Sequence, residues 1–375
     1  MATDCLRELI SLMSNQHSIR GGDVLRFMEY QTDKSLLPYN TFGIDVKAAA
    51  FAEYRSVGEL CALLEEYSVR FRGKPLLHIG SGSNLLFLGD YDGVVLRSQI
   101  RGVQVLSDDG EEVLVRVGAG EEHDWWVEHA SRQGWHGLEN LSLIPGQVGA
   151  SAVQNIGAYG VEACDVIDSV EGISLETGVA ARWSNAECGY SYRHSIFKDD
   201  LKGKYAITRV LYRLHKTFVP QLGYGGLSKI MSDKGIDPAK ATAMQVRDVI
   251  ADVRRKKLPD PSERGNAGSF FMNPILDECQ FGILREANPD MPFYAHGEGK
   301  YKVPAGWLIE QCGWKGRSLG RASVYERQAL ILVNDGGATG REVLELCEAV
   351  RSDVRGRFGI DLVPEVNVIA GDKGI

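Results

Sequence analysis

Residues 76–120 read LLHIGSGSNLLFLGDYDGVVLRSQIRGVQVLSDDGEEVLVRVGAG. Short apolar runs alternate here with glycine-rich turns, which is typical of strands joined by tight connections. Around Asp109-Gly110, valines recur at every second position, at 103, 105, 113, 115 and 117. This alternation, centred on an Asp-Gly pair, predicts a β-hairpin. The region is therefore expected to be rich in strands.

The segments that follow continue this pattern with little helix. Residues 123–134 predict a short amphipathic helix with Gly134 as its C-terminal cap. Residues 166–184 predict a second hairpin, which turns near Thr177-Gly178, and residues 204–214 predict a further strand. Residues 141–160, which lie between the predicted helix and the second hairpin, are rich in Gly, Ala and Ser and show no clear period.

The pattern changes near residue 218. Helices are expected at 241–258, where Pro259 ends the pattern, and from Pro304 to Gly313. A third helix is expected after Thr339, which forms a capping-box pattern with Glu342. A final strand covers 361–369. The chain is thus expected to be α+β, with a β-rich first half. In the polar segment 1–34, residues 6–13 could form one short helix.

Composition narrows the class of protein. The 375 residues carry 42 Lys and Arg against 50 Asp and Glu, a net charge of −8, which argues against a dedicated nucleic-acid binder. No apolar run approaches the roughly 18 residues of a membrane span, and early charges exclude a secretory signal. The histidines and seven cysteines show no metal-ligand spacing, so no metal is expected.

Two loops of small residues are candidates for binding phosphate. Residues 79–86 (IGSGSNLL) and 144–151 (IPGQVGAS) lack the dinucleotide fingerprint, and the chain has no P-loop motif. Their backbone N–H groups can still converge on a pyrophosphate, and together the loops could hold one extended dinucleotide. An ordinary tight turn explains the first loop equally well, and close backbone packing explains the second.

Three side chains are candidates for chemistry. Arg193, among aromatic residues in 189–198, could bind a carboxylate or a developing enolate, or simply make a cation–π contact. Ser269, within 265–274, could be reactive or structural. Glu365 lies among valines in the last predicted strand, and a buried carboxylate is costly unless it is paired or functional.

Together these segments resemble one family, the UDP-N-acetylenolpyruvoylglucosamine reductases (UDP-N-acetylmuramate dehydrogenases). Seven segments carry the resemblance in family order over nearly 90% of the chain: 40–43 (NTFG), 80–86, 144–160, 192–198, 265–274, 305–316 and 364–366 (PEV). Residues 222–231 (LGYGGLSKIM) and 257–261 (KLPDP) resemble the form of the family that has a tyrosine-bearing substrate loop.

The resemblance implies a fold and a domain plan. It implies an FAD-binding domain of the vanillyl-alcohol-oxidase type at 35–217, in subdomains of about 35–102 and 103–217. A C-terminal α/β substrate-binding domain follows at 218–370, and residues 1–34 form an N-terminal extension without a counterpart. It also implies a cytoplasmic monomer that binds small molecules, without nucleic acid or membrane insertion.

The resemblance also assigns roles. Catalysis falls to Ser269 as the proton donor, with Arg193 and Glu365 as partners, and Tyr224, Lys257, Asn273 and Gln328 face the substrate. Non-covalent FAD is held by Gly80, Ser81, Gly82, Ser83, Asn84, Leu85, Pro145, Gly146, Gly149, Ala150, Ser151 and Gly157, and NADPH is the reductant. One departure is His194, which stands where the family more often has an acidic residue.

The implied reaction reduces the double bond of an enolpyruvyl ether and explains why these residue types are needed. Hydride that arrives at the terminal carbon leaves a carbanion conjugated to the carboxylate, and Arg193 suits its stabilisation. Ser269 then donates a proton to this strong base. We expect Glu365 to be protonated or paired with Arg193. Lys257 could bind the diphosphate or simply end a solvated helix.

Two other functions remain open on the residues alone. A flavin oxidoreductase of the same fold that acts on an alcohol or lactone would need residues 80–160 but not the three catalytic candidates together. A non-catalytic nucleotide-binding protein would need neither the flavin chemistry nor these side chains. Bound flavin would exclude the non-catalytic protein. Bleaching by NADPH, followed by recovery when UDP-N-acetylglucosamine enolpyruvate is added without oxygen, would separate the two oxidoreductases.

Overall fold

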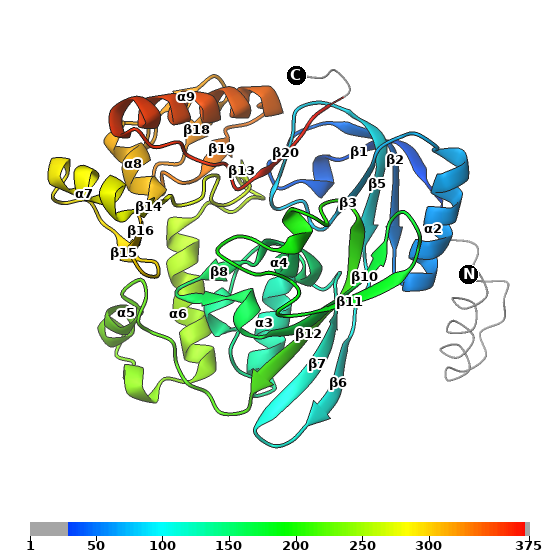
Figure 1. Cartoon of the computed structure of the whole chain (residues 1–375), viewed down its shortest axis with the longest axis horizontal. Coiled ribbons are helices and arrows are strands. Elements are labelled where there is room, and N and C mark those ends of the chain that lie inside the picture. Colours follow the sequence, from blue (N-terminus) through cyan, green and yellow to red (C-terminus); the bar gives the residue numbers. More distant parts are fainter. Residues whose placement is uncertain (1–28, 372–375) are drawn as a thin grey trace. The chain divides into compact units, whose positions relative to one another are not determined.

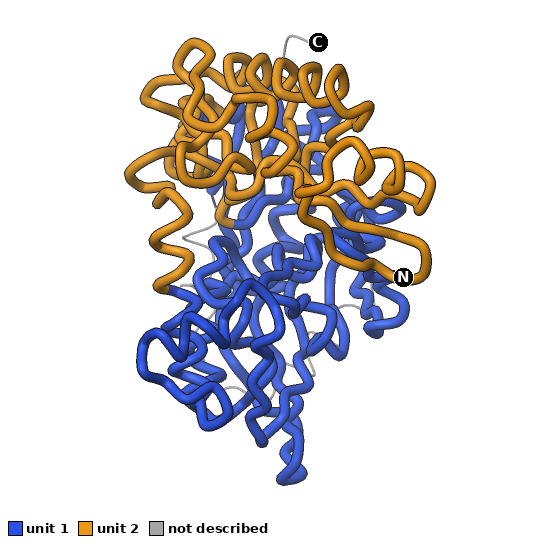
Figure 2. The backbone as a smooth tube through the Cα atoms, turned by 90° about the vertical axis from the view of Figure 1, so that its left-hand side faces the viewer, with its two compact units in different colours: residues 1–34, 48–80, 92–251 blue, residues 35–47, 81–91, 252–375 orange. Residues whose placement is uncertain are grey.

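The structure, a computed structural model, describes residues 29–371. Two compact units alternate along the chain, coloured blue and orange in Figure 2. Among the described residues, unit 1 contains those up to 34, 48–80 and 92–251, and unit 2 contains 35–47, 81–91 and those from 252 onward. The helix predicted at 6–13 lies outside the described residues.

Unit 1 contains a four-stranded sheet. Three of its strands have one terminal residue that is assigned to unit 2. Its order is β1 (Gln31–Ser35), β2 (Lys47–Tyr54), β5 (Tyr91–Ser98) and β3 (Leu76–Ile79). Helix α2 (Val57–Arg70) begins at Ser56, whose side chain accepts a hydrogen bond from Glu59 N. Leu60, Leu63 and Leu64 recur at helical spacing and pack against Tyr54 and the two inner strands.

The second sheet of unit 1 has five antiparallel strands, seen in Figure 1 in cyan and green. Their order is β11 (Ala180–Ser184), β10 (Ile167–Ser174), β12 (Tyr205–His215), β7 (Glu112–Gly118) and β6 (Val103–Asp108). The antiparallel pairing of β6 with β7 confirms the predicted hairpin. Val113, Val115 and Val117 on β7 are fully buried, as their alternation predicts, but Val105 on β6 is 46% exposed, so the alternation does not extend to that strand. The turn near Thr177-Gly178 is also confirmed, because Gly178 has a φ of +70° between β10 and β11.

Two helices cover one face of this sheet: α3 (His123–Arg132) and α4 (Val148–Gln154). Trp126 of α3 is fully buried and packs against Tyr212 of β12, with ring centroids 5.4 Å apart. Unit 1 also contains the hairpin of β8 (Gly157–Ala158) and β9 (Val161–Glu162), and helix α5 (Leu227–Asp233). Its 3₁₀ turns are η3 (Glu139–Leu141), η4 (Ala163–Asp165), η5 (Ile196–Lys198) and η6 (Pro238–Lys240). Helix α6 (Ala243–Lys257) begins in unit 1 and ends in unit 2.

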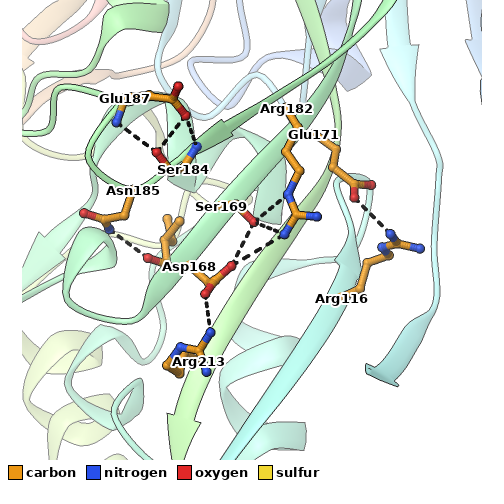
Figure 3. A network of polar contacts seen from close by, with 10 residues as sticks. Arg116, Asp168, Ser169, Glu171, Arg182, Ser184, Asn185, Glu187 and Arg213 are labelled. Atoms are coloured by element: carbon orange, nitrogen blue, oxygen red, sulfur yellow. Dashed lines mark hydrogen bonds and ion pairs between the residues drawn. The ribbon is translucent and has the colours of Figure 1, made fainter. Parts of the chain in front are cut away.

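The polar face of the five-stranded sheet carries a network of ion pairs (Figure 3). Asp168 accepts a 2.6 Å hydrogen bond from Arg213 on β12 and lies 3.6 Å from Arg182 on β11. Arg116 on β7 reaches across to Glu171 on β10 at 3.0 Å. Because these groups are partly exposed, each pair adds little free energy, but cross-strand pairs favour this register over a slipped one.

Unit 2 is built from short strands and three further helices. One sheet has the order β13 (Gly265–Asn266), β19 (Leu332–Asn334), β18 (Ala322–Val324) and β17 (Ser318–Leu319). Another has the order β14 (Ile275–Asp277), β16 (Lys300–Lys302) and β15 (Tyr294–Ala295), and β20 (Asn367–Ile369) pairs in parallel with β4 (Leu85–Phe87). The helices are α7 (Glu278–Ala287), α8 (Ala305–Gln311) and α9 (Gly340–Phe358), and η2 (Leu37–Tyr39) is a 3₁₀ turn.

The longest helix, α9, begins as its sequence predicts. The Thr339 side chain accepts from Glu342 N, and the Glu342 carboxylate accepts from Thr339 N at 2.8 Å, so the capping box is confirmed. The same carboxylate pairs with Arg321, and these partners lower the pKa of Glu342 to about 2. Between residues 29 and 371, no helix is long and apolar enough to cross a membrane.

Two details of the sequence reading need correction. Residues 141–160 contain helix α4, although their small side chains show no helical period, because the helix is set by packing against β12 and β7. The strand predicted at 361–369 forms regular pairing only at 367–369, preceded by an isolated bridge at Pro364, because proline has no N–H to donate to a ladder.

Candidate active site

The first glycine loop follows β3 and is held from behind by backbone. Gly82 has a φ of +68°, and a Cβ on it would lie 2.0 Å from the carbonyl oxygen of Tyr39, so only glycine is accommodated. The N–H of Thr41 donates to the Gly82 carbonyl at 3.2 Å, which joins the NTFG segment to this loop. The hydroxyl of Ser81 is buried and has no hydrogen-bond partner among the described residues. A buried donor of this kind fits a loop that binds a phosphate-containing ligand.

The second glycine loop packs tightly against the end of β7. Val148 N donates to the Glu121 carbonyl and Gly149 N to the Ala119 carbonyl, each at 2.9 Å. A Cβ on Gly149 would approach the Ala119 Cβ to 2.8 Å. Close packing is therefore a real reason for this glycine, as one of the sequence interpretations held. Gly146, with a φ of +125°, turns the chain into α4 just before it.

Gln147 bridges the surroundings of both loops, a role that the sequence reading missed. Its side chain is buried, and Nε2 donates to the carbonyls of Ser98 at 3.2 Å and Gly120 at 3.1 Å. The Oε1 atom faces Gly80, where a Cβ would come within 3.1 Å. A glutamine in a small-residue loop is the only signal in the sequence, and it does not reveal partners 27 and 49 residues away.

Arg193 is oriented by backbone carbonyls. Its guanidinium donates to Gly157 O at 2.8 Å and to Asn155 O at 3.4 Å, and it lies 5.6 Å from the centre of the Tyr192 ring. The residue has a φ of +57°, a conformation that costs a non-glycine residue free energy and is found most often at functional sites. Lys198 supports the turn by donating to the Arg193 carbonyl at 2.8 Å.

The departure at His194 has a structural counterpart. Its Nδ1 lies 3.4 Å from a carboxylate oxygen of Asp199, just beyond η5. An acidic side chain therefore lies next to the histidine that stands at this position. Both groups are substantially exposed, so this pair is expected to be weak.

In unit 2, Ser269 and Glu365 are brought together by strand-like pairing. Glu365 N donates to Phe270 O at 2.8 Å, Met272 N donates to Val363 O at 2.9 Å, and Phe271 forms a bridge with Pro364. The buried rings of Phe270 and Phe271 anchor the first segment, and the Ser269 side chain next to them is exposed. Glu365 itself is only half-buried, and Val363 is 56% exposed. The premise of a carboxylate buried in an apolar strand was therefore wrong.

The first glycine loop meets this pair within unit 2. Asn84 donates from Nδ2 to the Glu365 carbonyl at 3.2 Å, and Asn367 N donates to the Asn84 carbonyl at 3.0 Å. The parallel pairing of β20 with β4 continues this contact. One end of the predicted flavin loop and two of the predicted catalytic side chains thus share one small region of the fold.

Two predicted substrate residues surround the start of α8. Asn273 Oδ1 accepts from Ala305 N at 2.9 Å, and Gln328 Oε1 lies where a Cβ on Gly306 would come within 3.1 Å. The turn of Gln328 is tied to the Ser269 segment, because Phe270 N donates to the Leu330 carbonyl at 2.7 Å. Lys257 is exposed at the end of α6, in unit 2.

Tyr224 lies in unit 1, on the loop between β12 and α5. A Cβ on Gly160 would come 3.3 Å from Tyr224 Cβ, so the tyrosine loop packs directly on the turn between β8 and β9. Arg193 is bound to the start of the same hairpin at Gly157. Unit 1 thus gathers Arg193 and Tyr224, and unit 2 gathers Ser269, Glu365, Asn273 and Gln328.

A half-buried histidine stands just before the first glycine loop. His78 Nε2 and the Tyr54 hydroxyl are 2.5 Å apart, and burial lowers the pKa of His78 to about 4. Between about pH 4 and the ordinary histidine pKa of about 6.5, His78 is therefore protonated in the unfolded chain but neutral in the folded chain. Folded-state stability is complete above that range and is lost as the pH falls through it.

We predict that the free energy of unfolding falls by about 3 kcal/mol between pH 7 and pH 4 through His78 alone, because each unit of pKa difference is worth about 1.4 kcal/mol. Urea unfolding at a series of pH values measures this, with His78→Gln as the variant that cannot titrate. The variant should show a flatter pH dependence by that amount. Equal slopes in both proteins would show that His78 does not titrate in this range.

Comparisons with known proteins agree with this geometry. A family model described as an FAD binding domain matches residues 48–182, so the chain is a flavoprotein of that class. A model described as the UDP-N-acetylenolpyruvoylglucosamine reductase C-terminal domain matches residues 260–369. A UDP-N-acetylenolpyruvoylglucosamine reductase of Bacteroides fragilis is 52% identical over 336 residues, which are 89% of this chain and 98% of the relative.

Other relatives agree. The UDP-N-acetylenolpyruvoylglucosamine reductase of Burkholderia vietnamiensis is 47% identical over 333 residues, covering 89% of this chain and 95% of its own. The crystal structure of the enzyme from Thermus caldophilus superposes with a TM-score of 0.63 at 25% identity, covering 91% of this chain and 99% of that chain. The chain belongs to the UDP-N-acetylenolpyruvoylglucosamine reductase family. The expected α+β fold, with an FAD-binding domain and a C-terminal substrate domain, is confirmed.

Proposed function

We propose that the residues gathered in the two units divide the work of one reaction. The chain is an FAD- and NADPH-dependent oxidoreductase that reduces the enolpyruvyl double bond of UDP-N-acetylenolpyruvoylglucosamine to form UDP-N-acetylmuramate, a precursor of peptidoglycan. An oxidoreductase acting on an alcohol or lactone is not favoured, because it would not need Arg193, Ser269 and Glu365 together. The pairing of their two segments is the observation that carries the proposal.

The two glycine loops are proposed to hold FAD. The buried Ser81 hydroxyl and the backbone-lined turn at Gly82 fit a diphosphate, and the residues of 80–85, 145–151 and Gly157 assigned above form its cradle. The chemistry that FAD supplies when bound is hydride transfer between NADPH and the substrate. The protein contributes position and electrostatics around it.

The anion that forms on the substrate is proposed to be stabilised and protonated by Arg193, Ser269 and Glu365. The guanidinium fork of Arg193, fixed by two carbonyls, binds the substrate carboxylate as negative charge spreads onto it. The hydroxyl of Ser269 gives its proton to the carbon that becomes a carbanion. Glu365 orients these partners.

The remaining polar residues are proposed to bind the nucleotide part of the substrate. Tyr224, Lys257 and Asn273 face the diphosphate, and Gln328 lies near the flavin or the substrate. The exposed Lys257 ammonium at the end of α6 is suited to two negative phosphates.

We further propose a cytoplasmic monomer with domains at 35–217 and 218–370. Light scattering measures the monomer mass, which should be near 41.2 kDa.

The function is tested by two half-reactions in the absence of oxygen. The purified protein should absorb near about 450 nm, as bound flavin does, and NADPH should bleach this absorption. Adding UDP-N-acetylenolpyruvoylglucosamine should restore the flavin absorption. It should release UDP-N-acetylmuramate in an amount equal to the flavin that is reoxidised. If NADPH bleaches the protein but the sugar nucleotide leaves it reduced, the substrate assignment fails while the flavin assignment stands.

A further inference from the structure

A short backbone segment supports two of the proposed functional side chains at once. Residues 155–160 run from the end of α4 through β8 to the following turn, all within unit 1 (Figure 1). The guanidinium of Arg193 is bound to the carbonyls of Asn155 and Gly157 on this segment. The tyrosine loop packs on its other end, at Tyr159 and Gly160. The distance between Arg193 and Tyr224 therefore depends on how firmly the loop is held there.

The tyrosine loop has little intrinsic order of its own. Gly223, Gly225 and Gly226 surround Tyr224, and the last two have φ values of +68° and +69°. Glycines of this kind lose much conformational entropy when the loop is ordered, so contacts from outside the loop must hold it. Hydrogen bonds to its backbone are the natural means.

Asn140 makes that connection. It lies on η3, its side chain is 4% exposed, and Nδ2 donates one hydrogen bond to Tyr159 O at 2.9 Å and another to Gln221 O at 2.8 Å. A side-chain amide has two N–H donors on one nitrogen, and here both are used. One bond holds the β8–β9 turn and the other holds the start of the tyrosine loop, so the amide joins the two segments.

The 3₁₀ turn that carries Asn140 is itself well fixed. The carboxylate of Glu139 lies 2.8 Å from His136 Nδ1 and accepts from Gly137 N at 2.9 Å. The ring of His136 packs on Phe218, at the start of the same loop, with centroids 5.1 Å apart. The turn therefore contacts the tyrosine loop at two points, Phe218 and Gln221.

We propose that Asn140 is a positioning residue that fixes the tyrosine loop at a set distance from Arg193, and so sets the affinity for the diphosphate substrate. This inference rests on the proposed roles of Tyr224 and Arg193. Asn140 acts through the backbone of Tyr159 and Gln221, so it should influence the sugar-nucleotide half-reaction and leave the NADPH half-reaction alone.

The test separates the two half-reactions in Asn140→Ala and Asn140→Asp. With two hydrogen bonds lost, the Kd for UDP-N-acetylenolpyruvoylglucosamine in anaerobic stopped-flow reoxidation should rise roughly 10- to 100-fold. The aspartate should be the worse variant, because a carboxylate has no donor and would face two carbonyl oxygens. Flavin content and the rate of reduction by NADPH should stay within about twofold of the wild type. Such a change is smaller than the tenfold change that corresponds to about 1.4 kcal/mol.

Asn185 offers a matched control elsewhere in unit 1 (Figure 3). Its Nδ2 also donates to two carbonyls, Cys164 O at 2.8 Å and Ile167 O at 2.7 Å, away from the tyrosine loop. Asn185→Ala should cost comparable folding stability without changing the Kd for the sugar nucleotide. If Asn140→Ala and Asn185→Ala affect both half-reactions alike, Asn140 is a structural residue and the inference is overturned.

A second pair of variants moves the same loop without touching Asn140, should its variants not fold. Gly225 and Gly226 have the same backbone conformation, but a Cβ on Gly225 would lie 3.1 Å from the Tyr159 ring, and one on Gly226 has nothing within 4 Å. Gly225→Ala should raise the Kd for the sugar nucleotide at least several-fold more than Gly226→Ala. Equal effects would contradict a precise seat of the loop on Tyr159.

Tyr224→Phe distinguishes this inference from the function it rests on. If Tyr224→Phe weakens sugar-nucleotide binding and the Asn140 variants do not, the positioning role is wrong and the proposed role of Tyr224 stands. If Tyr224→Phe has no effect, the diphosphate role of Tyr224 fails, and the inference about Asn140 fails with it.

Discussion

Replacing Ser269 by alanine should lower the rate of sugar-nucleotide reduction by about 10³- to 10⁴-fold, the upper range of general acid catalysis. The proton that Ser269 is proposed to donate is needed only after hydride has reached the substrate. Reduction of the flavin by NADPH should therefore proceed at the wild-type rate. Anaerobic stopped-flow absorbance measures both steps in one protein.

Two further variants make the Ser269 result specific. Ser269→Cys retains an acidic hydrogen and should recover part of the lost rate. Ser318→Ala removes a serine that is also exposed in unit 2, on β17, and should behave as the wild type. A Ser269→Ala protein that still reduces the sugar nucleotide within tenfold of the wild-type rate would remove Ser269 from the mechanism.

Replacing Gly82 by alanine should destabilise the fold by about 3 kcal/mol or more and weaken FAD binding by over about 100-fold. Two costs combine there: a left-handed φ of +68°, and a Cβ that would lie 2.0 Å from Tyr39 O and 2.9 Å from Asn40 Cα. Since these are backbone atoms, which cannot yield cheaply, the loop itself must move. Flavin content on purification and the free energy of unfolding in urea measure the two effects.

Gly73→Ala is the control for the conformational part of that cost. Gly73 has a φ of +84°, and a Cβ on it has nothing within 4 Å, so only the backbone penalty of about 1 kcal/mol applies. FAD binding should be unchanged in this variant. If Gly82→Ala and Gly73→Ala cause equally small losses of stability and of FAD binding, the close packing of the glycine loop on residues 39–41 is incorrect.

Local features of the fold could be predicted from the sequence because local physics determines them. The hairpin around Asp109-Gly110 and the capping box at Thr339 each depend on residues within a few positions, and both are confirmed. The predictable part of the site was its motifs, such as the glycine loop at 80–86 and the segment around Ser269.

Features set by distant contacts were not predictable. Helix α4 owes its place to packing against a sheet, and nothing in its small residues announces a helix. The amides of Gln147 and Asn140 are ordinary in the sequence, yet Asn140 binds carbonyls 19 and 81 positions away. The half-buried position of Glu365 also follows from the pairing of its segment with the distant residues 270–272 rather than from its valine neighbours.

The most direct test of the central claim is a double-mutant cycle between Arg193 and Ser269, read from the rate at which the sugar nucleotide reoxidises the reduced protein. Wild type, Arg193→Lys, Ser269→Ala and the double variant are compared at saturating substrate. If both side chains act on one substrate anion, the double variant should lose far less than the product of the two single losses. Losses that simply multiply would contradict joint action on one anion.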